Sequence, residues 1–115
     1  MLLNGGELDG VRVLKAETVA EMTRNQLPEE AMKAKNGGRA DVGDGFGLGF
    51  GVRVGKDDAA AGRAVGEYYW GGAASTHFWV SPRQGLAVVA LEQFMPSRAK
   101  LQQAIKPLIY QAVKE

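Results

Sequence analysis

The sequence predicts an α+β fold, in which one C-terminal helix packs across an antiparallel sheet of about four strands and a short helix precedes the sheet. Apolar extended segments follow one another between residues 45 and 94, and the short turns between them favour antiparallel neighbours. Residues 97–113 place apolar side chains at helical spacing. The length of 115 residues predicts a single domain, 1–115.

Composition narrows the classes of function. Hydrophobic residues make up 45% and charged residues 23% of the chain, as in ordinary globular domains. A net charge of +1 without a basic run argues against a nucleic-acid partner. There is no Cys and one histidine, His77, so neither a metal site nor a bound cofactor is expected. No apolar run could span a membrane, and Met1–Leu3 do not resemble a signal peptide, so a cytoplasmic location is the default expectation.

The first residues predict small, separate elements. Met1–Asn4 reads as the last turn of a helix stopped by Gly5 and Gly6, which suggests that the chain starts inside a larger fold and leaves open whether Met1 is a natural start. Residues 7–14 predict a hairpin that turns at Asp9-Gly10.

Two short helical segments should follow. Residues 17–27 form an amphipathic pattern with a weak N-cap. Pro28 can open a further helical turn, which Asn36-Gly37-Gly38 should end.

Residues 45–54 alternate glycine with apolar side chains, and this period of two predicts one strand with an apolar face and a bare face. Something bulky is expected to pack flat against the bare face. A dinucleotide-binding loop is rejected, because the order G-x-G-x-x-G does not occur and no helix follows.

Three more strands are expected, at residues 64–70, 76–81 and 86–94. Pro82-Arg83-Gln84-Gly85 predicts a turn between the last two. The last segment is nearly all apolar at first, which is typical of a central strand covered on both sides.

The closing helix is expected over residues 97–113, with Ser97 as its N-cap and Pro107 as an internal kink. The spacing predicts that one face lies across the sheet, made of Leu101, Ala104, Ile105, Leu108, Ile109 and Val113.

The most informative stretch is residues 70–80, WGGAASTHFWV, where four residues without side chains beyond a methyl precede a strand. Bare backbone of this kind can aim N–H groups at a developing negative charge, as in an oxyanion hole. It can equally be a bulge where two elements pack closely, and spacing alone favours the bulge. His77 reads as a packed or surface residue.

The order of these pieces resembles a known family. The blocks GFGLGFGV, GEYYWGGAASTHFWVSP and GLAVVALEQ, followed by a terminal helix, resemble the C-terminal part of serine β-lactamase-like proteins, and MLLNGGELDGVRVL resembles the segment before it. The nearest branch is the family VIII carboxylesterases, which are related to class C β-lactamases. The resemblance covers nearly the whole chain and implies a partial β-lactamase/transpeptidase-like fold.

The resemblance also implies which residues would act. The family uses a Ser-x-x-Lys nucleophile motif, a tyrosine motif that supplies a general base, and a third strand of the type Lys-Thr-Gly, His-x-Gly or Trp-Gly-Gly. Trp70-Gly71-Gly72 matches the third, so Ala73 would offer its backbone N–H to the oxyanion, and Trp70 would border the acyl pocket. The Ser-x-x-Lys match at Ser97–Lys100 follows the strand instead of preceding it, and the surroundings of Tyr68 and Tyr110 do not match the tyrosine motif.

These observations predict a truncated or fragmentary serine hydrolase that is inactive alone, whose partner is a complementing N-terminal hydrolase segment. The alternative is a non-catalytic binding or assembly module. An enzyme that uses its own Ser97 is a third, weaker interpretation. In the family, further strands complete the sheet beside residues 86–94, so this chain should present an open edge there and form a homo-oligomer.

Overall fold

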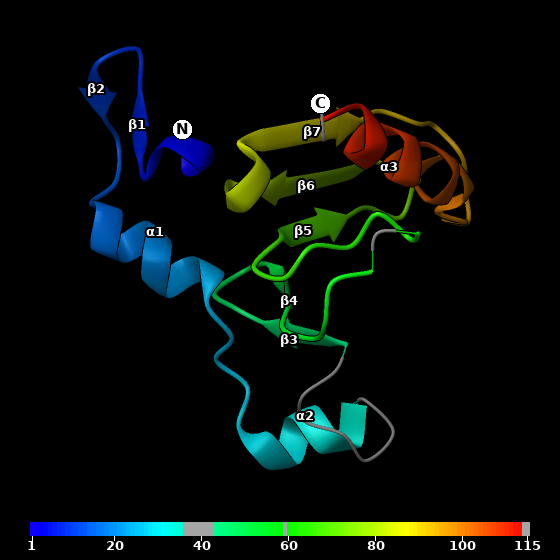
Figure 1. Ribbon diagram of the computed structural model, residues 1–115, viewed down its shortest axis with the longest axis horizontal. Coiled ribbons are helices and arrows are strands. Elements are labelled where there is room, and N and C mark those ends of the chain that lie inside the picture. The colour runs from blue at the N-terminus through cyan, green and yellow to red at the C-terminus, as the bar shows by residue number, and fades with distance from the viewer. Residues whose placement is uncertain (36–42, 59, 114–115) are drawn as a thin grey trace.

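The computed structural model describes residues 1–35, 43–58 and 60–113, and it has the expected α+β architecture. The main sheet has five antiparallel strands rather than about four (Figure 1). In spatial order they are β3 (Asp44–Phe46), β4 (Gly51–Arg53), β5 (Tyr68–Gly71), β6 (His77–Ser81) and β7 (Leu86–Ala90). The predicted N-terminal hairpin is confirmed as a separate two-stranded sheet of β1 (Glu7–Leu8) and β2 (Val11–Arg12).

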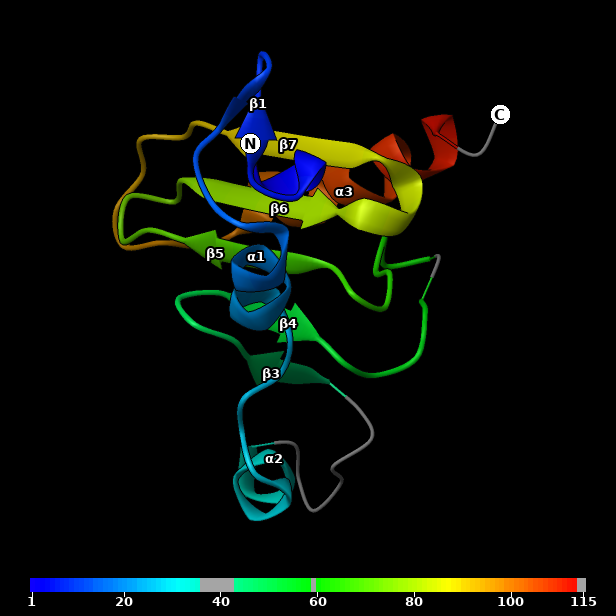
Figure 2. The same cartoon turned by 90° about the vertical axis from the view of Figure 1, so that its left-hand side faces the viewer.

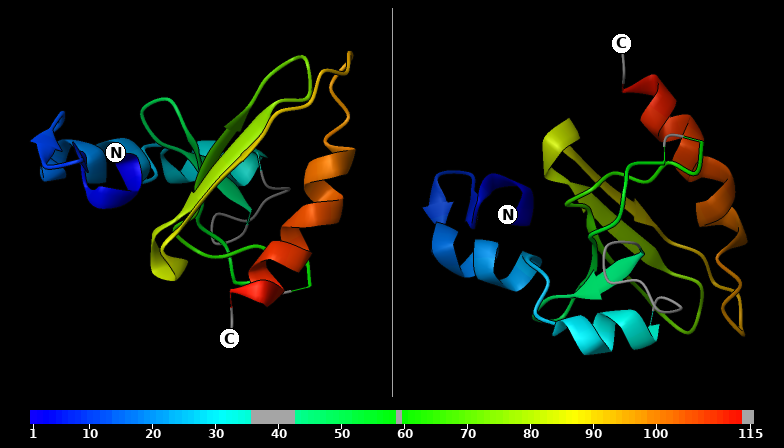
Figure 3. Two further views of the ribbon diagram at one scale, coloured as in Figure 1. Left: turned by 90° about the horizontal axis from the view of Figure 1, so that it is seen from above. Right: turned by 60° about the horizontal axis from the view of Figure 1, so that its bottom comes forward.

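Helices lie on both sides of the main sheet. The α-helices are α1 (Ala16–Thr23), α2 (Glu29–Lys35) and α3 (Lys100–Ala112), and the 3₁₀ turns are η1 (Leu2–Asn4) and η2 (Pro82–Gln84). Helix α3 packs across one face, as predicted, whereas η1 and α1 lie on the opposite side (Figures 2 and 3). Among the described helices, none combines the length and the hydrophobicity that crossing a bilayer requires.

Each face of the sheet has its own apolar core. Beneath α3, the fully buried Trp79 packs with Ala64 and Tyr110. The other face buries Val52, Tyr68 and Val80, and Leu2, Leu3 and Phe50 cover them. The register of β5 against β6 sets this division, because Tyr69 lies opposite Trp79 and Tyr68 lies opposite Val80.

The glycine-rich segment 45–54 is a hairpin of β3 and β4, so the prediction of one strand is wrong. The chain reverses over residues 47–50, where Gly49 adopts a φ of 98° that favours glycine. The expected close packing against bare backbone is present but comes from several elements. A Cβ on Gly51 would lie 2.8 Å from the Tyr69 ring, one on Gly45 would lie 2.2 Å from the Asn25 side chain, and one on Gly47 would lie 2.1 Å from the Met22 carbonyl oxygen.

The first helix ends earlier than predicted. Helix α1 ends at Thr23, since Asn25 turns inward and its side-chain oxygen accepts N–H bonds from Leu27 and Phe46, at 3.1 and 3.0 Å. Helix α2 starts directly after Pro28, as expected. The stop expected at residues 36–38 lies outside the described residues.

The closing helix starts at Lys100 rather than at Ser97. Its N-cap position is Ala99, at a φ of 49°, so the prediction that Ser97 caps this helix is wrong. Pro107 does lie inside the helix.

The buried face of α3 also differs from the predicted one. Its buried residues are Lys106 and Tyr110, with Ile105 and Ile109 beside them, whereas Leu108 is 63% exposed. Ile105 and Ile109 of the predicted face therefore do pack against the core, whereas Leu101 and Leu108 of that face are exposed.

Strand β7 lies at an edge of the sheet, so the interpretation of residues 86–94 as a covered central strand is wrong. The strand ends at Ala90, and Val89 and Leu91 are 68% and 82% exposed. Among the described residues, no strand pairs with the outer side of β7.

Candidate functional site

The candidate site is the tight turn that joins β5 to β6. The Gly72 N–H donates to the Thr76 carbonyl at 2.8 Å, and the Ser75 N–H donates to the Gly72 carbonyl at 3.1 Å. Ala73 and Ala74 therefore form the tip of the turn. Ser75 follows with a φ of 68°, the left-handed residue that completes a three-residue hairpin loop.

Buried hydrogen bonds hold this turn against the segment before α3. The Ser75 hydroxyl donates to the Phe94 carbonyl at 2.8 Å, and its oxygen accepts from the Arg98 N–H at 3.3 Å. The Phe94 N–H donates to the Ala74 carbonyl at 3.0 Å. Serine at a left-handed position is uncommon, and these contacts explain how the 1% exposed Ser75 is held there.

The tip of the turn leaves backbone donors available. Within the described part of the chain, neither the Ala73 nor the Ala74 N–H has a hydrogen-bond acceptor, and Ala73 is the more exposed of the two. A free N–H on a rigid turn is the kind of group that stabilises an oxyanion without reorganisation.

The glycines before it are required by local packing. A Cβ on Gly71 would lie 2.6 Å from His77 Nδ1, and one on Gly72 would lie 2.5 Å from Thr76 Oγ1. Close approach of the His77 and Thr76 side chains therefore accounts for the bare backbone, whether or not a ligand also approaches it.

The end of β5 has a free edge and an apolar hollow beside it. Strand β4 pairs only with Tyr68 and Tyr69, so the Trp70–Gly71 end of β5 has no partner on that side among the described strands. Trp70 is half exposed, and its ring meets the Phe46 ring edge-on with centroids 5.3 Å apart. An open hollow of about 370 Å³ adjoins this end, and its lining includes Trp70, Phe78, Val89 and Leu91.

His77 lines this hollow beside Gly71, half buried as a packed residue. Its Nε2 is buried and has no hydrogen-bond partner in the described part of the chain. It adjoins the turn, but nothing pairs it with a hydroxyl that it could activate.

The other residues that the sequence analysis considered do not assemble into a catalytic group. Ser97 and Lys100 are exposed, and no hydrogen bond joins them within the described ranges. Ser97 does belong to the segment that contacts the turn, through its neighbour Arg98. Tyr68 is buried on the sheet face opposite α3, where burial raises its pKa, whereas Tyr110 belongs to the buried face of α3 on the other side of the sheet.

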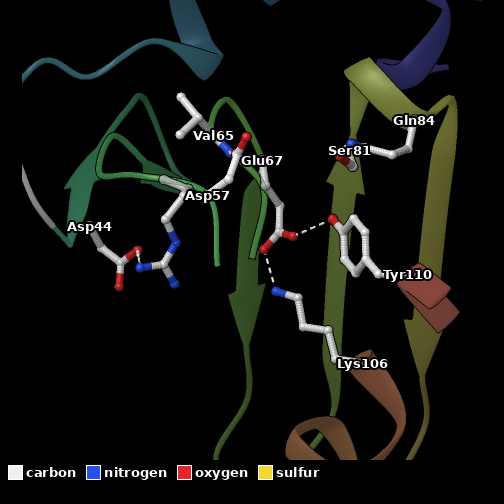
Figure 4. A network of polar contacts seen from close by, with 9 residues as sticks. Asp44, Asp57, Val65, Glu67, Ser81, Gln84, Lys106 and Tyr110 are labelled. Carbon is white, nitrogen blue, oxygen red and sulfur yellow. Dashed lines mark hydrogen bonds and ion pairs between the residues drawn. The ribbon is translucent and has the colours of Figure 1, made fainter. Parts of the chain in front are cut away.

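A buried polar network beneath α3 was missed by the sequence analysis (Figure 4). The fully buried Glu67 carboxylate accepts hydrogen bonds from Lys106 Nζ and the Tyr110 hydroxyl. Burial lowers the pKa of Lys106 and raises that of Tyr110. Nearby, Arg53 pairs with Asp44 at 2.9 Å. The available signal was the position of Lys106 and Tyr110, one turn apart, beside the apolar residues of the terminal helix.

The His, Asp and Glu side chains of the described residues form no group of three that could hold a metal ion. What the turn offers chemically is a backbone donor, a free strand edge and an apolar hollow.

Solved structures match nearly all of this chain and between a quarter and a third of their own. Unliganded simvastatin synthase (LovD) from Aspergillus terreus is 24% identical with a TM-score of 0.77, over 99% of this chain and 33% of that chain. The LovD6 mutant of this enzyme is 25% identical with the same TM-score of 0.77, over 98% of this chain and 32% of its own. EstCE1, a hydrolase with promiscuous acyltransferase activity, is 25% identical with a TM-score of 0.69, over 94% of this chain and 26% of its own.

Two curated relatives come from Mycobacterium tuberculosis, the uncharacterized protein MT1414 and the protein Rv1367c of a second strain. Each is 35% identical over 103 residues, which cover 84% of this chain and 25% of the relative. The chain thus spans about a quarter of the length of the curated relatives it matches. No protein-family model matches the sequence.

The five-stranded sheet, the helix across one face and the structural similarity to LovD and EstCE1 agree with the resemblance seen in the sequence. The chain has a partial β-lactamase-like fold, that of the C-terminal part of serine β-lactamase-like proteins.

Proposed function

We propose that this chain forms one wall of the active site of a β-lactamase-like serine hydrolase or acyltransferase and is inactive alone. The nucleophile and the general base would come from residues outside this sequence. The observation that carries the proposal is the free Ala73 N–H at the end of the Trp70-Gly71-Gly72 strand, on a turn fixed by hydrogen bonds.

In this proposal each site residue has a defined role. The Ala73 N–H donates to the oxyanion that forms when the ester or amide carbonyl is attacked. Gly71 presents backbone along the free edge of β5, where the substrate would lie, and Gly72 begins the turn that carries Ala73. Trp70 borders the acyl group, which the apolar hollow beside it could receive.

Exposed apolar side chains support a complementing segment. Large apolar residues are exposed on both sides of the sheet and around its β7 edge, among them Val89, Leu91, Leu101 and Leu108. Exposed apolar surface of this kind commonly marks an interaction site. The relatives are three to four times as long as this chain. The partner that agrees best with this difference in length is a complementing hydrolase segment, which would cover part of the exposed surface.

A chimera tests the oxyanion role. The matched segment of EstCE1 is replaced by this chain, and hydrolysis of an aryl ester is measured. Proline at position 73 removes the N–H, yet proline is favoured at the second position of a turn, so Ala73→Pro should fold. It should lower kcat by about 10²–10³, the cost of losing one oxyanion donor.

Ala73→Gly is the matched control for this chimera, because it keeps the N–H, and it should retain activity within a few-fold. Equal activity of the Ala73→Pro and Ala73→Gly chimeras would refute the proposed role of Ala73.

The second candidate is an assembly module without catalysis, which the open edge of β7 favours. Unpaired edge strands recruit further strands, and residues 86–91 contain no charge or proline that would oppose this. The chain should then sediment as a dimer or larger oligomer, and Val89→Lys should shift it to monomer. A dilute sample that sediments as a stable monomer would count against this candidate.

A further inference from the structure

Two residues that meet at the β5–β6 turn hold an uncommon backbone conformation. Ser75 in the turn has a φ of 68°, and Ala99 at the start of α3 has a φ of 49°. Among the described residues other than glycine, only Asp9 shares this left-handed region with them. Such strained conformations persist where the surroundings impose them, and they cluster at functional sites. Ser75 and Ala99 flank one contact, because the Arg98 N–H that donates to the Ser75 hydroxyl directly precedes Ala99.

The backbone of Ser75 fixes the peptide plane that carries the Ala73 N–H. This N–H and the Gly72 carbonyl belong to one planar trans peptide unit, in which they point in opposite directions. The Gly72 carbonyl accepts a hydrogen bond from the Ser75 N–H at 3.1 Å. The Ala73 N–H, which has no acceptor in the described ranges, therefore points away from Ser75. The direction of the proposed oxyanion donor is thus set by Ser75.

The side chain of Ser75 anchors this arrangement to the segment before α3. Its buried hydroxyl donates to the Phe94 carbonyl at 2.8 Å and accepts from the Arg98 N–H at 3.3 Å. The Phe94 N–H donates to the Ala74 carbonyl at 3.0 Å, and the Arg98 guanidinium carbon lies 4.8 Å from the centroid of the Phe94 ring. The residues on both sides of this contact therefore hold each other in place, while Ala73 stays exposed at the tip of the turn.

We propose that Ser75 is a positioning residue of this site, which holds the Ala73 N–H in the direction of the oxyanion. This inference rests on the proposed function. Ser75 is 1% exposed, so it acts through Ala73 and not by touching the substrate. A preorganised donor stabilises the charge that develops in the transition state. Loss of the Ser75 hydroxyl should therefore lower kcat and leave KM nearly unchanged, because Trp70 and the apolar hollow beside it stay in place.

The test uses the EstCE1 chimera and the same aryl ester. Ser75→Gly removes the hydroxyl with its two hydrogen bonds, yet glycine adopts a φ of 68° without strain, so the turn should still form. The substitution should lower kcat about 10-fold and change KM less than about two-fold. Asp9→Gly is the matched control, because it relieves the same left-handed strain in the separate β1–β2 hairpin. It should leave kcat and KM unchanged.

The Ala73→Pro chimera separates positioning from folding. Once the donor is absent, Ser75→Gly should lower kcat by less than about two-fold further, whereas a general loss of fold would lower kcat by the same factor in both backgrounds. Equal factors in the two backgrounds, or a Ser75→Gly chimera as active as Asp9→Gly, would overturn the positioning role and leave the proposed function intact. Equal activity of the Ala73→Pro and Ala73→Gly chimeras would instead refute the oxyanion role, and the positioning role with it.

Discussion

Replacing Lys106 with methionine tests the buried ion pair that joins α3 to the sheet. Lys106 and Glu67 are 7% and 0% exposed, and they pair directly. The substitution keeps the volume of the side chain but leaves Glu67 with Tyr110 as its only donor among the described residues. A buried charge that loses its partner costs about 3–5 kcal/mol, against a total stability of roughly 6–17 kcal/mol for a domain of this length.

The companion variants separate the ion pair from the packing. Tyr110→Phe removes one bond to the carboxylate and should cost about 1.5–3 kcal/mol. The triple variant Glu67→Leu, Lys106→Met and Tyr110→Phe replaces the network with apolar groups, and it should lie close to the wild type or above it. The exposed Lys100→Met at the start of α3 is the control and should change stability by less than about 0.5 kcal/mol.

Urea unfolding followed by circular dichroism measures each free energy of unfolding. The reasoning predicts a large loss in the single variant and its recovery in the triple variant. If the free energy of unfolding of Lys106→Met lay within about 0.5 kcal/mol of that of Lys100→Met, the reasoning would be refuted, because Glu67 could not then be both buried and charged.

Two further predictions concern the loops. The pKa of Asp57 is held below its ordinary value of 3.8, first by the Val65 N–H and then by Arg83. This stabilisation is present above pH 3.8 and is lost as the pH falls through the lower folded-state pKa. Asp57→Asn should therefore have a lower free energy of unfolding than the wild type at pH 6, and the two proteins should converge near pH 2 in urea unfolding. A difference independent of pH would contradict this. Gly72→Ala should destabilise the β5–β6 turn by about 1–3 kcal/mol, because the new Cβ would lie 2.5 Å from Thr76 Oγ1, and adding Thr76→Ala should recover most of the loss in thermal unfolding. A Gly72→Ala variant as stable as the wild type would contradict this prediction, because the turn would then tolerate a side chain at position 72.

Local turn chemistry made much of the fold predictable. The Asp9-Gly10 turn fixed the N-terminal hairpin, and Pro82 with Gly85 fixed the antiparallel pairing of β6 and β7. The segment 45–54 was harder, because an alternation of period two is the same in one strand and in two strands folded back on each other. The reversal depends on the backbone of Gly49, which periodicity does not reveal.

The closing helix shows a second limit. Apolar spacing alone selected a face containing Leu108, but the structure buries Lys106 and Tyr110, because Glu67 from a distant segment satisfies both. That partner is not visible from the helix sequence. Ser97 likewise looked like a cap, although the helix starts after the left-handed Ala99.

The candidate site was predictable in part. The sequence marked residues 71–74 as bare backbone, and the structure shows the turn that they belong to and its hydrogen bonds to the segment before α3. Ser75 joins the turn to its packing partner through hydrogen bonds to Phe94 and Arg98. These residues are far from Ser75 in the sequence, so no local pattern predicts the contacts.

The measurement that tests the central claim most directly is the intact mass of the chain after incubation with a fluorophosphonate serine probe, with Ser97→Ala as the control. The proposal that the nucleophile lies outside this sequence predicts no adduct on either protein. A stoichiometric adduct that maps to Ser97 and disappears in the control would contradict it, and would make this chain a compact hydrolase with a rearranged site.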